Sequence, residues 1–329
     1  MISVFYTSLS DNKKTVIDPI VKSVSWSGDI MQAARTCKLE LSNTLNGKNQ
    51  KIKIESGGLI QLLYEDVEIF RGVIFSDNIK STGAQSVTAY DENMYLLKNT
   101  DTIKLRNKTA STFIKEVCST FGIQTGHVTN TDYVISKMIF KEKTLWDMFV
   151  TVLTETKNHT NRKFVITSSK GKLNLYERKE QLVKSVIENG VNLLNADYQK
   201  DINDMKTKVK VVGENDKSST VQDDSLVAKF GMMQHYENAI QIKNESELNR
   251  LATERLKQKS VIDDEAKVYA LGNIEVIAGK SVYVSESLTK IIGGYYVSTD
   301  EHKIEGKEHT MSLTLTATDE LPTLEYEEE

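Results

Sequence analysis

Two pairs of adjacent acidic residues are the first candidates for chemistry in this 329-residue chain. Asp91 and Glu92 follow the stretch "SVTAY", and Asp319 and Glu320 follow "LTLTAT". Two carboxylates act as acid and base in glycoside hydrolysis when they face each other across the bond that is cleaved. Neighbouring residues of a strand point to opposite faces of a sheet, so neither pair can flank one bond. We therefore predict a turn or interface role for both pairs.

Two histidines, His302 and His309, are close together in the sequence "STDEHKIEGKEHTMSL". A hairpin that turns between them would bring them across from each other, with Glu301 or Glu308 near by, as in a transition-metal site. Two histidines without a further ligand make an incomplete site, however, and a turn rich in lysine and glutamate is typical of a solvated hairpin. We therefore predict no metal at this pair.

The remaining reactive and aromatic residues also indicate structural roles. Cys37 and Cys118 have neither a second cysteine nor a histidine beside them, so we expect small buried residues rather than a disulfide or a metal site. Trp26 and Trp146 lie on apolar stripes and are expected to anchor the core rather than to stack on sugars. Phosphate-binding, zinc-protease and nucleophile-elbow motifs are absent from the sequence. We predict no catalytic, cofactor-binding or metal-binding residues and no enzymatic activity.

Length and composition limit the class of protein. A chain of this length exceeds one compact core, and domain sizes suggest roughly two to four folding units. Hydrophobic residues make up 39% and charged residues 27%, as in folded globular proteins. The net charge of −4 is spread along the chain, so we predict no specific nucleic-acid partner. The N-terminus lacks the pattern of a secretion signal, and no apolar run reaches the roughly 18 residues of a membrane span, so we expect synthesis in a cytoplasm and no membrane association.

Residues 16 to 100 alternate apolar and polar side chains in short runs. The runs are separated by turn-forming glycines, at Gly28, Gly47, Gly57, Gly58 and Gly83. A period of two predicts antiparallel strands with one buried face, joined by turns. We expect a sheet or a small barrel in this part of the chain.

From about residue 101 the hydrophobic period becomes helical. Thr109 is the expected N-cap of a first helix that ends before Gly122, and Thr144 with Asp147 forms the capping box of a second helix. A hairpin follows, with its turn at residues 169–171. The middle of the chain is therefore predicted to be a small α+β unit.

The last third of the chain begins with a strand at residues 207–213 and a polar stretch at 213–225. A helical region at about 226–260 follows, and Asn244 is the expected cap of its clearest helix. Strands return from about residue 267 to 318. For Pro322 and the acidic "LEYEEE" that follows, we expect a mobile, solvated tail.

Residues 57–92 and 279–320 share one pattern, which indicates an internal repeat. "GGLIQLLY" matches "GKSVYVSE", "FRGVIFSDN" matches "IGGYYVSTD", and "VTAYDE" matches "LTATDE". Two glycines are fifteen residues apart in each copy, Gly57 with Gly72 and Gly279 with Gly294. We predict two similar all-β modules, one near each end of the chain.

This repeat also suggests where the second module begins. Residues 207–215 would be its early strand, matching residues 36–44 of the first module. The helical stretch at about 226–260 would then be an insertion within the second module.

Several stretches carry a family resemblance: "FRGVIF", "AYDENMYLLKN", "DINDMKTKVKVVG", and "GYYVSTDEH" with "HTMSLTL". In their content and order they resemble the baseplate hub proteins of contractile phage tails and phage-tail-like particles, especially the XkdQ/YqbQ-type hubs of Gram-positive prophages. The resemblance covers nearly the whole chain. It implies a homotrimer in which each chain carries two similar β-barrel domains. Six modules then meet the six-fold tail tube, and the other side offers three-fold symmetry to the central spike.

Pattern and resemblance together predict a multidomain α+β chain with two small antiparallel β-barrel modules, an α+β domain between them and a helical insertion in the second barrel. The expected domains are residues 1–100 for the first, tube-facing barrel module, 101–180 for the α+β domain, 181–222 for the start of the second barrel module, 223–262 for the helical insertion, and 263–329 for the rest of the second module and the acidic tail.

The predicted function is that of a structural baseplate hub in a phage tail or phage-tail-like particle, made in the bacterial cytoplasm and built into the virion. Expected partners are further copies of the chain, the tail tube protein, the central spike protein, and tape-measure and other baseplate proteins. The alternative is a cell-wall-directed enzyme or carbohydrate-binding module, and a third interpretation is a β-rich cytosolic adaptor. Clearing of cell-wall suspensions would favour the enzyme, and neighbouring genes for tail sheath and tube would favour the hub.

Overall fold

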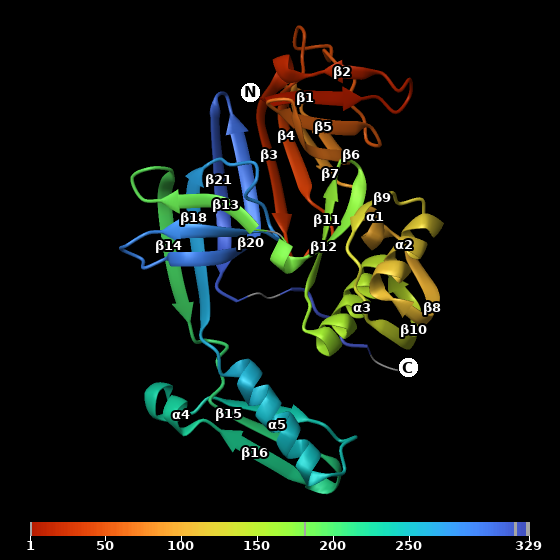
Figure 1. Cartoon of the computed structure of the whole chain (residues 1–329). Helices are drawn as coiled ribbons and strands as arrows, with labels where there is room; N and C mark the ends of the chain where they lie inside the picture. The colour runs from red at the N-terminus through yellow and green to blue at the C-terminus, as the bar shows by residue number, and fades with distance from the viewer. Residues whose placement is uncertain (1, 181, 319–320, 327–329) are drawn as a thin grey trace. The chain divides into compact units, whose positions relative to one another are not determined.

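The computed structural model describes residues 2–180, 182–318 and 321–326. The chain divides into two compact units, a larger one of residues 1–197 and 267–329 and a smaller one of residues 198–266. Strands predominate, so the protein is a mostly β, multidomain chain (Figure 1). In the described part of the chain, no helix is long and apolar enough to cross a membrane.

The first half of the large sheet comes from the N-terminal residues. Its strands are β1 (Ile2–Thr7), β2 (Lys14–Val16), β3 (Val21–Asp29), β4 (Thr36–Ser42), β5 (Leu59–Tyr64), β6 (Val67–Ile79) and β7 (Ala84–Tyr90), with the 3-10 helix η1 (Asp18–Ile20) before β3. Their hydrogen-bonded order is β3-β4-β7-β6-β5-β1-β2, with antiparallel neighbours throughout. The alternation of β4 buries Leu39 and Leu41 and exposes Lys38 and Glu40. The predicted antiparallel strands are confirmed, and β1 and β2 add to them.

The second half of the large sheet comes from six later strands. They are β13 (Leu182–Glu188), β14 (Leu193–Asp201), β18 (Asp263–Leu271), β19 (Ser281–Ser285), β20 (Ile292–Glu305) and β21 (Glu308–Thr316). Their order is β14-β18-β21-β20-β19-β13. This order matches β3-β4-β7-β6-β5-β1 of the first half, strand for strand. The edge strands differ in direction, because β1 is antiparallel to β5 whereas β13 is parallel to β19.

The central strands of the two halves share a further detail. A β-bulge interrupts the pairing of β6 with β7 between Ile74 and Ser76, and another interrupts the pairing of β20 with β21 between Val297 and Thr299. Ile74 and Val297, just before each bulge, are both buried. Matching strand order supports the predicted repeat, and the two bulges lie one residue apart in its alignment.

The sheet is not closed into two barrels, contrary to our expectation. β20 pairs with β19 and β21, and its C-terminal half also pairs with β3 in the register Thr299 to Asp29 and Glu305 to Ser23. Because one long strand serves both halves, they share one ladder from β14 to β2 within the described residues. The predicted modules are thus two halves of a continuous open sheet.

The prediction that residues 207–215 form the early strand of the second module is wrong. β15 (Lys208–Val212) lies in the smaller unit, where it pairs with β16 (Ser218–Gln222) and β17 (Gln234–Asn238). By strand order, β14 and β18 occupy the places of β3 and β4, so residues 202–262 are inserted between them. Alternation in "KVKVV" is typical of any half-buried strand and does not tell which sheet it joins.

The smaller unit is a compact α/β element. It also contains the 3-10 helix η3 (Glu214–Asp216), α4 (Asp224–Phe230) and α5 (Glu245–Lys259). The predicted polar stretch and helical insertion therefore contain two strands as well as helices. Asn244 caps α5 as predicted, because its side chain accepts a hydrogen bond from the backbone N–H of Ser246. Leu248, Ala252 and Leu256 of α5 pack on Val209 and Val211 of β15.

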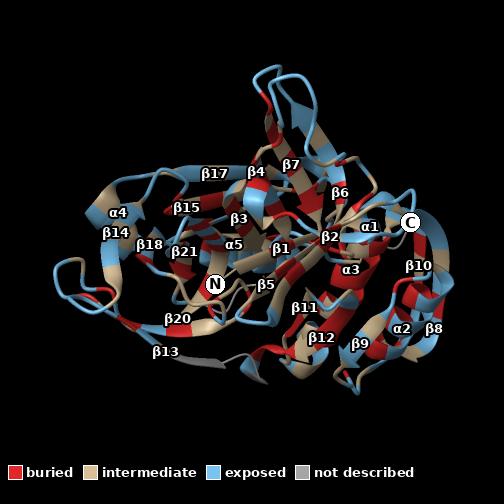
Figure 2. Cartoon of the chain, turned by 90° about the horizontal axis from the view of Figure 1, so that it is seen from above, coloured by how far each residue is buried: buried red, intermediate tan, exposed pale blue. Residues whose placement is uncertain are grey.

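Residues 94–180 form the α+β part of the larger unit. Its elements are α1 (Met94–Lys98), β8 (Thr100–Thr109), α2 (Ala110–Thr120), β9 (Thr125–Val128), β10 (Val134–Thr144), α3 (Leu145–Thr160), β11 (Phe164–Ser169), β12 (Lys172–Glu177) and η2 (Arg178–Glu180). The predicted caps are confirmed, since Thr109 Oγ1 accepts from the N–H of Thr112 and Thr144 Oγ1 from that of Asp147. The α+β part has its own hydrophobic core, and α3 packs a largely buried face on it (Figure 2).

For residues 322–326 the expectation of a mobile tail is not met, whereas residues 327–329 of the predicted tail lie outside the described residues. Residues 321–326 lie against the α+β part, where the hydroxyl of Tyr326 accepts a hydrogen bond from the N–H of Ile139 at 3.0 Å. The N–H of Leu324 donates to Thr154 Oγ1 at 3.1 Å. An apolar anchor and two backbone hydrogen bonds outweigh the tendency of acidic residues to stay in water.

Candidate assembly site at the junction of the two sheet halves

The pairing of β20 with β3 brings a buried ion pair to the junction. Arg35, in the loop between β3 and β4, donates to both carboxylate oxygens of Asp300 on β20, Nη1 to Oδ1 at 2.8 Å and Nη2 to Oδ2 at 2.5 Å. The two side chains are 15% and 0% exposed. Asp300 Oδ1 also accepts from the N–H of Ala278 at 2.6 Å. A buried charge must be paired, so this contact fixes the two halves in one geometry.

Asp91 supports the same loop from the end of β7. Its Oδ2 accepts from the N–H of Arg35 at 3.2 Å and its Oδ1 from the N–H of Asn93 at 3.1 Å. Burial raises the pKa of the Asp91 carboxyl to about 7. These contacts confirm the predicted turn role of Asp91.

The neighbouring carboxylate serves a different element. Glu92 Oε2 accepts from Ser168 Oγ on β11 at 3.1 Å, and burial raises the pKa of Glu92. Asp91 and Glu92 thus bind different partners and do not converge on one point. The matching residues Asp319 and Glu320 lie outside the described residues.

The two histidines meet beneath Trp26. Glu305 and Glu308 are the last paired residues of the β20–β21 hairpin, and the chain turns between them. This hairpin places His302 Nδ1 3.1 Å from His309 Nε2. His302 Nε2 lies 2.8 Å from the carbonyl oxygen of Val276, and its ring stacks on Trp26 with centroids 4.7 Å apart. Sequence thus predicted the juxtaposition, and residues 305–308 of the turn are exposed as expected, but His302 itself is fully buried.

The hydrogen bonds determine which nitrogens carry protons. Only an N–H can bond to the carbonyl of Val276, so His302 is protonated at Nε2 and accepts at Nδ1 from the Nε2–H of His309. Burial lowers the pKa of His302, and burial lowers that of His309 to about 4. Both rings are therefore neutral near pH 7, and the buried Nδ1 of His309 has no hydrogen-bond partner.

The surroundings do not complete a metal site. Within the described ranges, no group of three or more histidine, cysteine, aspartate or glutamate side chains is placed to hold a metal ion. Glu301 and Glu308 are exposed, whereas His302 is fully buried. Strand alternation turns Glu301 to the opposite face of the sheet. His302 and His309 therefore pack and form hydrogen bonds at the junction.

The other predicted residues are mostly structural, as expected. Trp26 is 2% exposed in the first sheet half, and Cys37 and Cys118 are buried and free. Burial raises the pKa of Cys118 to about 12, which makes its thiol unreactive. Trp146 is only partly buried and borders a cavity, so the prediction of a core anchor holds for Trp26 but is incomplete for Trp146.

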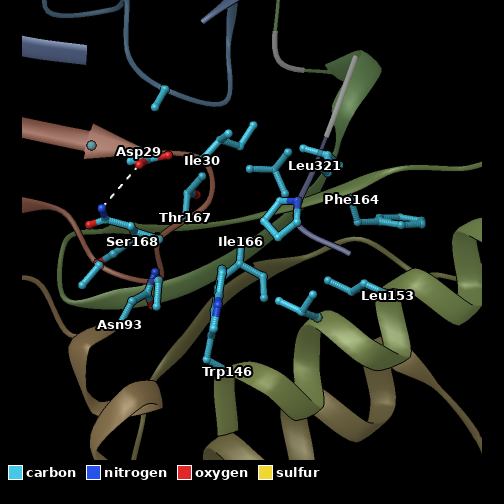
Figure 3. A pocket seen from close by; sticks show the side chains of 18 of the residues that line it. Asp29, Ile30, Asn93, Trp146, Leu153, Phe164, Ile166, Thr167, Ser168 and Leu321 are labelled. Carbon is cyan, nitrogen blue, oxygen red and sulfur yellow. Dashed lines mark hydrogen bonds between the residues drawn. The ribbon is translucent and has the colours of Figure 1, made fainter. Parts of the chain in front are cut away.

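That cavity lies between α3, β11 and the C-terminal segment. Trp146 and Leu153 come from α3, Ile166 from β11 and Leu321 from the segment itself (Figure 3). Its volume is about 70 Å³. Asp29, Asp91, Lys157, Lys163 and Ser168 also line it, and Asp91 and Ser168 make the structural hydrogen bonds described above.

Comparison with protein families establishes the relationship of the chain. The family model described as YQBQ-like matches residues 24–316. The chain belongs to the YqbQ-like family. Its relatives include two proteins of Bacillus subtilis, the uncharacterized protein YqbQ and the phage-like element PBSX protein XkdQ. They are 31% and 30% identical over 311 residues, which cover 93% of this chain and 95% of each relative.

Solved structures show where the fold of this YqbQ-like family member recurs. The 43 kDa tail protein of prophage MuSo2 from Shewanella oneidensis has a TM-score of 0.71 at 11% identity, with 95% of this chain and 97% of that chain covered. A chain in the Francisella PdpA-VgrG complex has a TM-score of 0.59 at 9% identity, with 100% and 60% covered. At these identities the likeness shows a shared fold.

Proposed function

We propose that the chain is the structural hub of a contractile tail baseplate, in an infectious phage or a phage-tail-like particle. Membership of the YqbQ-like family and relationship to a PBSX protein support a structural role in a tail. The fold shared with the MuSo2 tail protein and with a chain of the PdpA-VgrG complex supports a place near the spike of such a particle. Under this proposal the chain is not an enzyme.

One observation carries the proposal: the two halves of the large sheet have the same strand order. A homotrimer of such chains presents six similar modules around one axis and three identical chains on its other side. The six modules offer equivalent contacts to a hexameric tail tube, and the three-fold side suits a trimeric spike.

The junction described above has a clear role in this assembly. The pseudo-six-fold ring requires each chain to hold its two modules at a fixed angle, and the shared strand β20 and the Arg35–Asp300 pair provide that rigidity. We assign residues 1–100 to the tube-facing module, residues 101–180 to the α+β domain, and residues 182–201 with 263–318 to the second module. Tape-measure and other baseplate proteins are further proposed partners, and the protein joins the virion after synthesis in the cytoplasm.

Electron cryomicroscopy of intact particles tests the proposal. We expect three copies of the chain between the last tube hexamer and the spike. Quantitative mass spectrometry should then give three copies of the chain for every six tube subunits in one ring. A location elsewhere, or a copy number that is not a multiple of three, would contradict the hub. Clearing of purified cell walls by the isolated protein would instead favour the enzymatic alternative.

A further inference from the structure

Residues 321–326 bind the α+β part of the large unit in the manner of an extended peptide ligand. The segment has neither helix nor strand structure. Its backbone and one anchor make the contacts: the N–H of Leu324 reaches Thr154 Oγ1, and the hydroxyl of Tyr326 accepts from the N–H of Ile139. The Tyr326 ring also meets the edge of Phe140, with centroids 6.2 Å apart. Main-chain bonds with one aromatic anchor are typical of peptide recognition.

Helix α3 offers a hydrogen-bond acceptor, Thr154 Oγ1, to the backbone of this segment. Thr154 Oγ1 donates its own hydrogen to the carbonyl of Val150 at 2.8 Å, so its lone pairs are free to accept from Leu324. Asn158 Nδ2, one turn further along, donates to Glu325 Oε2 at 3.3 Å. The groove therefore binds the backbone of the segment at Leu324 and the side-chain carboxylate at Glu325.

Charge also matches between the segment and its groove. Lys141 and Lys143 of β10 line the cavity that Glu325 and Tyr326 border, and they outnumber the one acidic residue that the groove contributes, Asp147. The sequence continues after Tyr326 with three glutamates. A basic strand beside an acidic peptide favours their association, most strongly at low salt.

The chain's own segment fills the groove incompletely. A cavity of about 320 Å³ remains beside Leu324, Glu325 and Tyr326, and the cavity of about 70 Å³ remains beside Leu321. Leu324 is still 40% exposed. Close packing is the rule where two surfaces have optimised their fit, so a segment that leaves this much space is replaceable.

We propose that this groove receives the C-terminal segment of a neighbouring copy when the chain oligomerises. The same contacts form within one chain or between two, so exchange costs little, and the tether to a neighbour in a trimer keeps the local segment concentration high. The exchanged segments then link the subunits. This inference rests on the proposed oligomeric hub.

The groove itself is tested on a chain that ends at Thr318, with a labelled peptide of residues 318–329 and fluorescence anisotropy as the measurement. We expect saturable binding that weakens as salt is raised. A peptide with Tyr326→Ala should bind at least tenfold more weakly. The full-length chain should also bind at least tenfold more weakly, because its own segment competes. Absence of binding to the truncated chain, with its circular dichroism unchanged, would overturn the proposal.

Two threonines of α3 supply a matched pair of variants. Thr154→Val removes the acceptor for Leu324, whereas Thr156→Val removes the same type of helix bond, from Thr156 Oγ1 to the carbonyl of Val152, without touching the segment. We expect Thr154→Val to weaken peptide binding about five- to tenfold and Thr156→Val to leave it unchanged. Equal losses in both variants would mean that the helix, not the contact, is responsible, and would count against the groove.

Exchange between copies is tested by cross-linking in assembled particles. One tagged chain carries Thr154→Cys, a second, differently tagged chain carries Leu324→Cys, and both are built into the same particles. We expect a cross-linked product that contains both tags. A third chain that carries both substitutions is the control. If this chain cross-links internally while the mixed particles give no product with both tags, exchange is refuted, and a trimer seen by light scattering leaves the hub intact. A chain that stays monomeric in particles refutes the hub itself.

Discussion

The two halves of the large sheet share a strand order but differ in how much they bury. The buried positions of β4 are Cys37, Leu39 and Leu41, and those of the corresponding strand β18 are Ala266, Val268 and Ala270. Smaller side chains bury less apolar area and so contribute less to stability. The second half therefore depends more on its attachment to the first. Equal topology in a repeat does not mean equal stability.

The connections at matching places also differ between the halves. Residues 30–35 join β3 to β4 and bring Arg35 to the junction, whereas residues 202–262 join β14 to β18 and fold into the smaller unit. The first half uses this position to hold its partner half. The second half uses it to carry an added unit.

The largest effect is expected from breaking the ion pair that joins the halves. Asp300→Asn keeps the shape of the side chain but takes away the carboxylate that is bonded to the buried Arg35 guanidinium. Removing one member of a buried pair costs about 3–5 kcal/mol. Guanidinium unfolding followed by tryptophan fluorescence measures this loss, because Trp26 and Trp146 both lie in the larger unit.

A surface pair on the same strand is the control for this variant. Lys303 and Glu305 of β20 are 2.7 Å apart and are 55% and 65% exposed. Solvent and salt screen such a pair, so Glu305→Gln should leave the unfolding midpoint unchanged. If Asp300→Asn is as mild as Glu305→Gln, the junction does not hold the halves together.

Truncating matched core positions tests the inequality of the two halves. Leu39→Ala in β4 should cost about 2–5 kcal/mol of unfolding free energy, because it leaves a cavity in the larger core. Val268→Ala at the matching place in β18 removes fewer methyl groups and should cost about 1–2 kcal/mol. Denaturant unfolding of both variants measures the difference, and a larger loss for Val268→Ala would reverse the ranking of the halves.

Local rules predicted those parts of the fold that depend on neighbouring residues in the sequence. Thr109 and Thr144 cap their helices because a cap needs only the residues that follow it. The repeat was also visible, because both copies need the same alternation and turns. The early strands of the second half were missed because "LLNADYQKD" of β14 is largely exposed and shows little alternation.

The candidate site was harder to predict because its partners are distant in the sequence. His302 and His309 were recognised as neighbours across a hairpin, which is a local feature. Arg35 lies 265 residues from Asp300 and belongs to a loop without periodicity. One signal was available: Asp300 alternates with His302 and Ile304 on the buried face of β20, and a charge at an inward position requires a partner.

The junction should also show a pH dependence through His309. The pKa of His309 is lowered from 6.5 to about 4 in the folded chain, so the unfolded chain takes up a proton first as pH falls. Stability contributed by neutral His309 is complete above pH 6.5 and is lost between 6.5 and about 4, on the order of 2–3 kcal/mol. Comparing the unfolding free energy of His309→Phe with that of the parent chain over this range measures the effect of His309 together with its hydrogen bond to His302.

Asp91 also contributes to the pH dependence of stability, so the variant must be compared with the parent chain. Its pKa is raised from 3.8 to about 7, so the folded chain binds a proton that the unfolded chain lacks, and this contribution grows as pH falls from 7 to about 4. The two effects oppose each other in the parent chain, but Asp91 is present in both proteins and cancels. A pH slope that is unchanged by His309→Phe would show that His309 titrates normally in the fold.

The smallest effect is expected from removing the smaller unit. A short glycine-rich loop in place of residues 203–261 still joins β14 to β18, which are neighbours in the sheet. The smaller unit has its own core around Val211 and Leu248, so its loss removes no buried residue of the larger sheet. The melting midpoint of the shortened chain should match that of the parent, and an isolated fragment of residues 198–266 should melt cooperatively by circular dichroism. A shortened chain that no longer unfolds cooperatively would mean that the second half needs its insertion as well as the junction, and that its weak core is compensated from both sides.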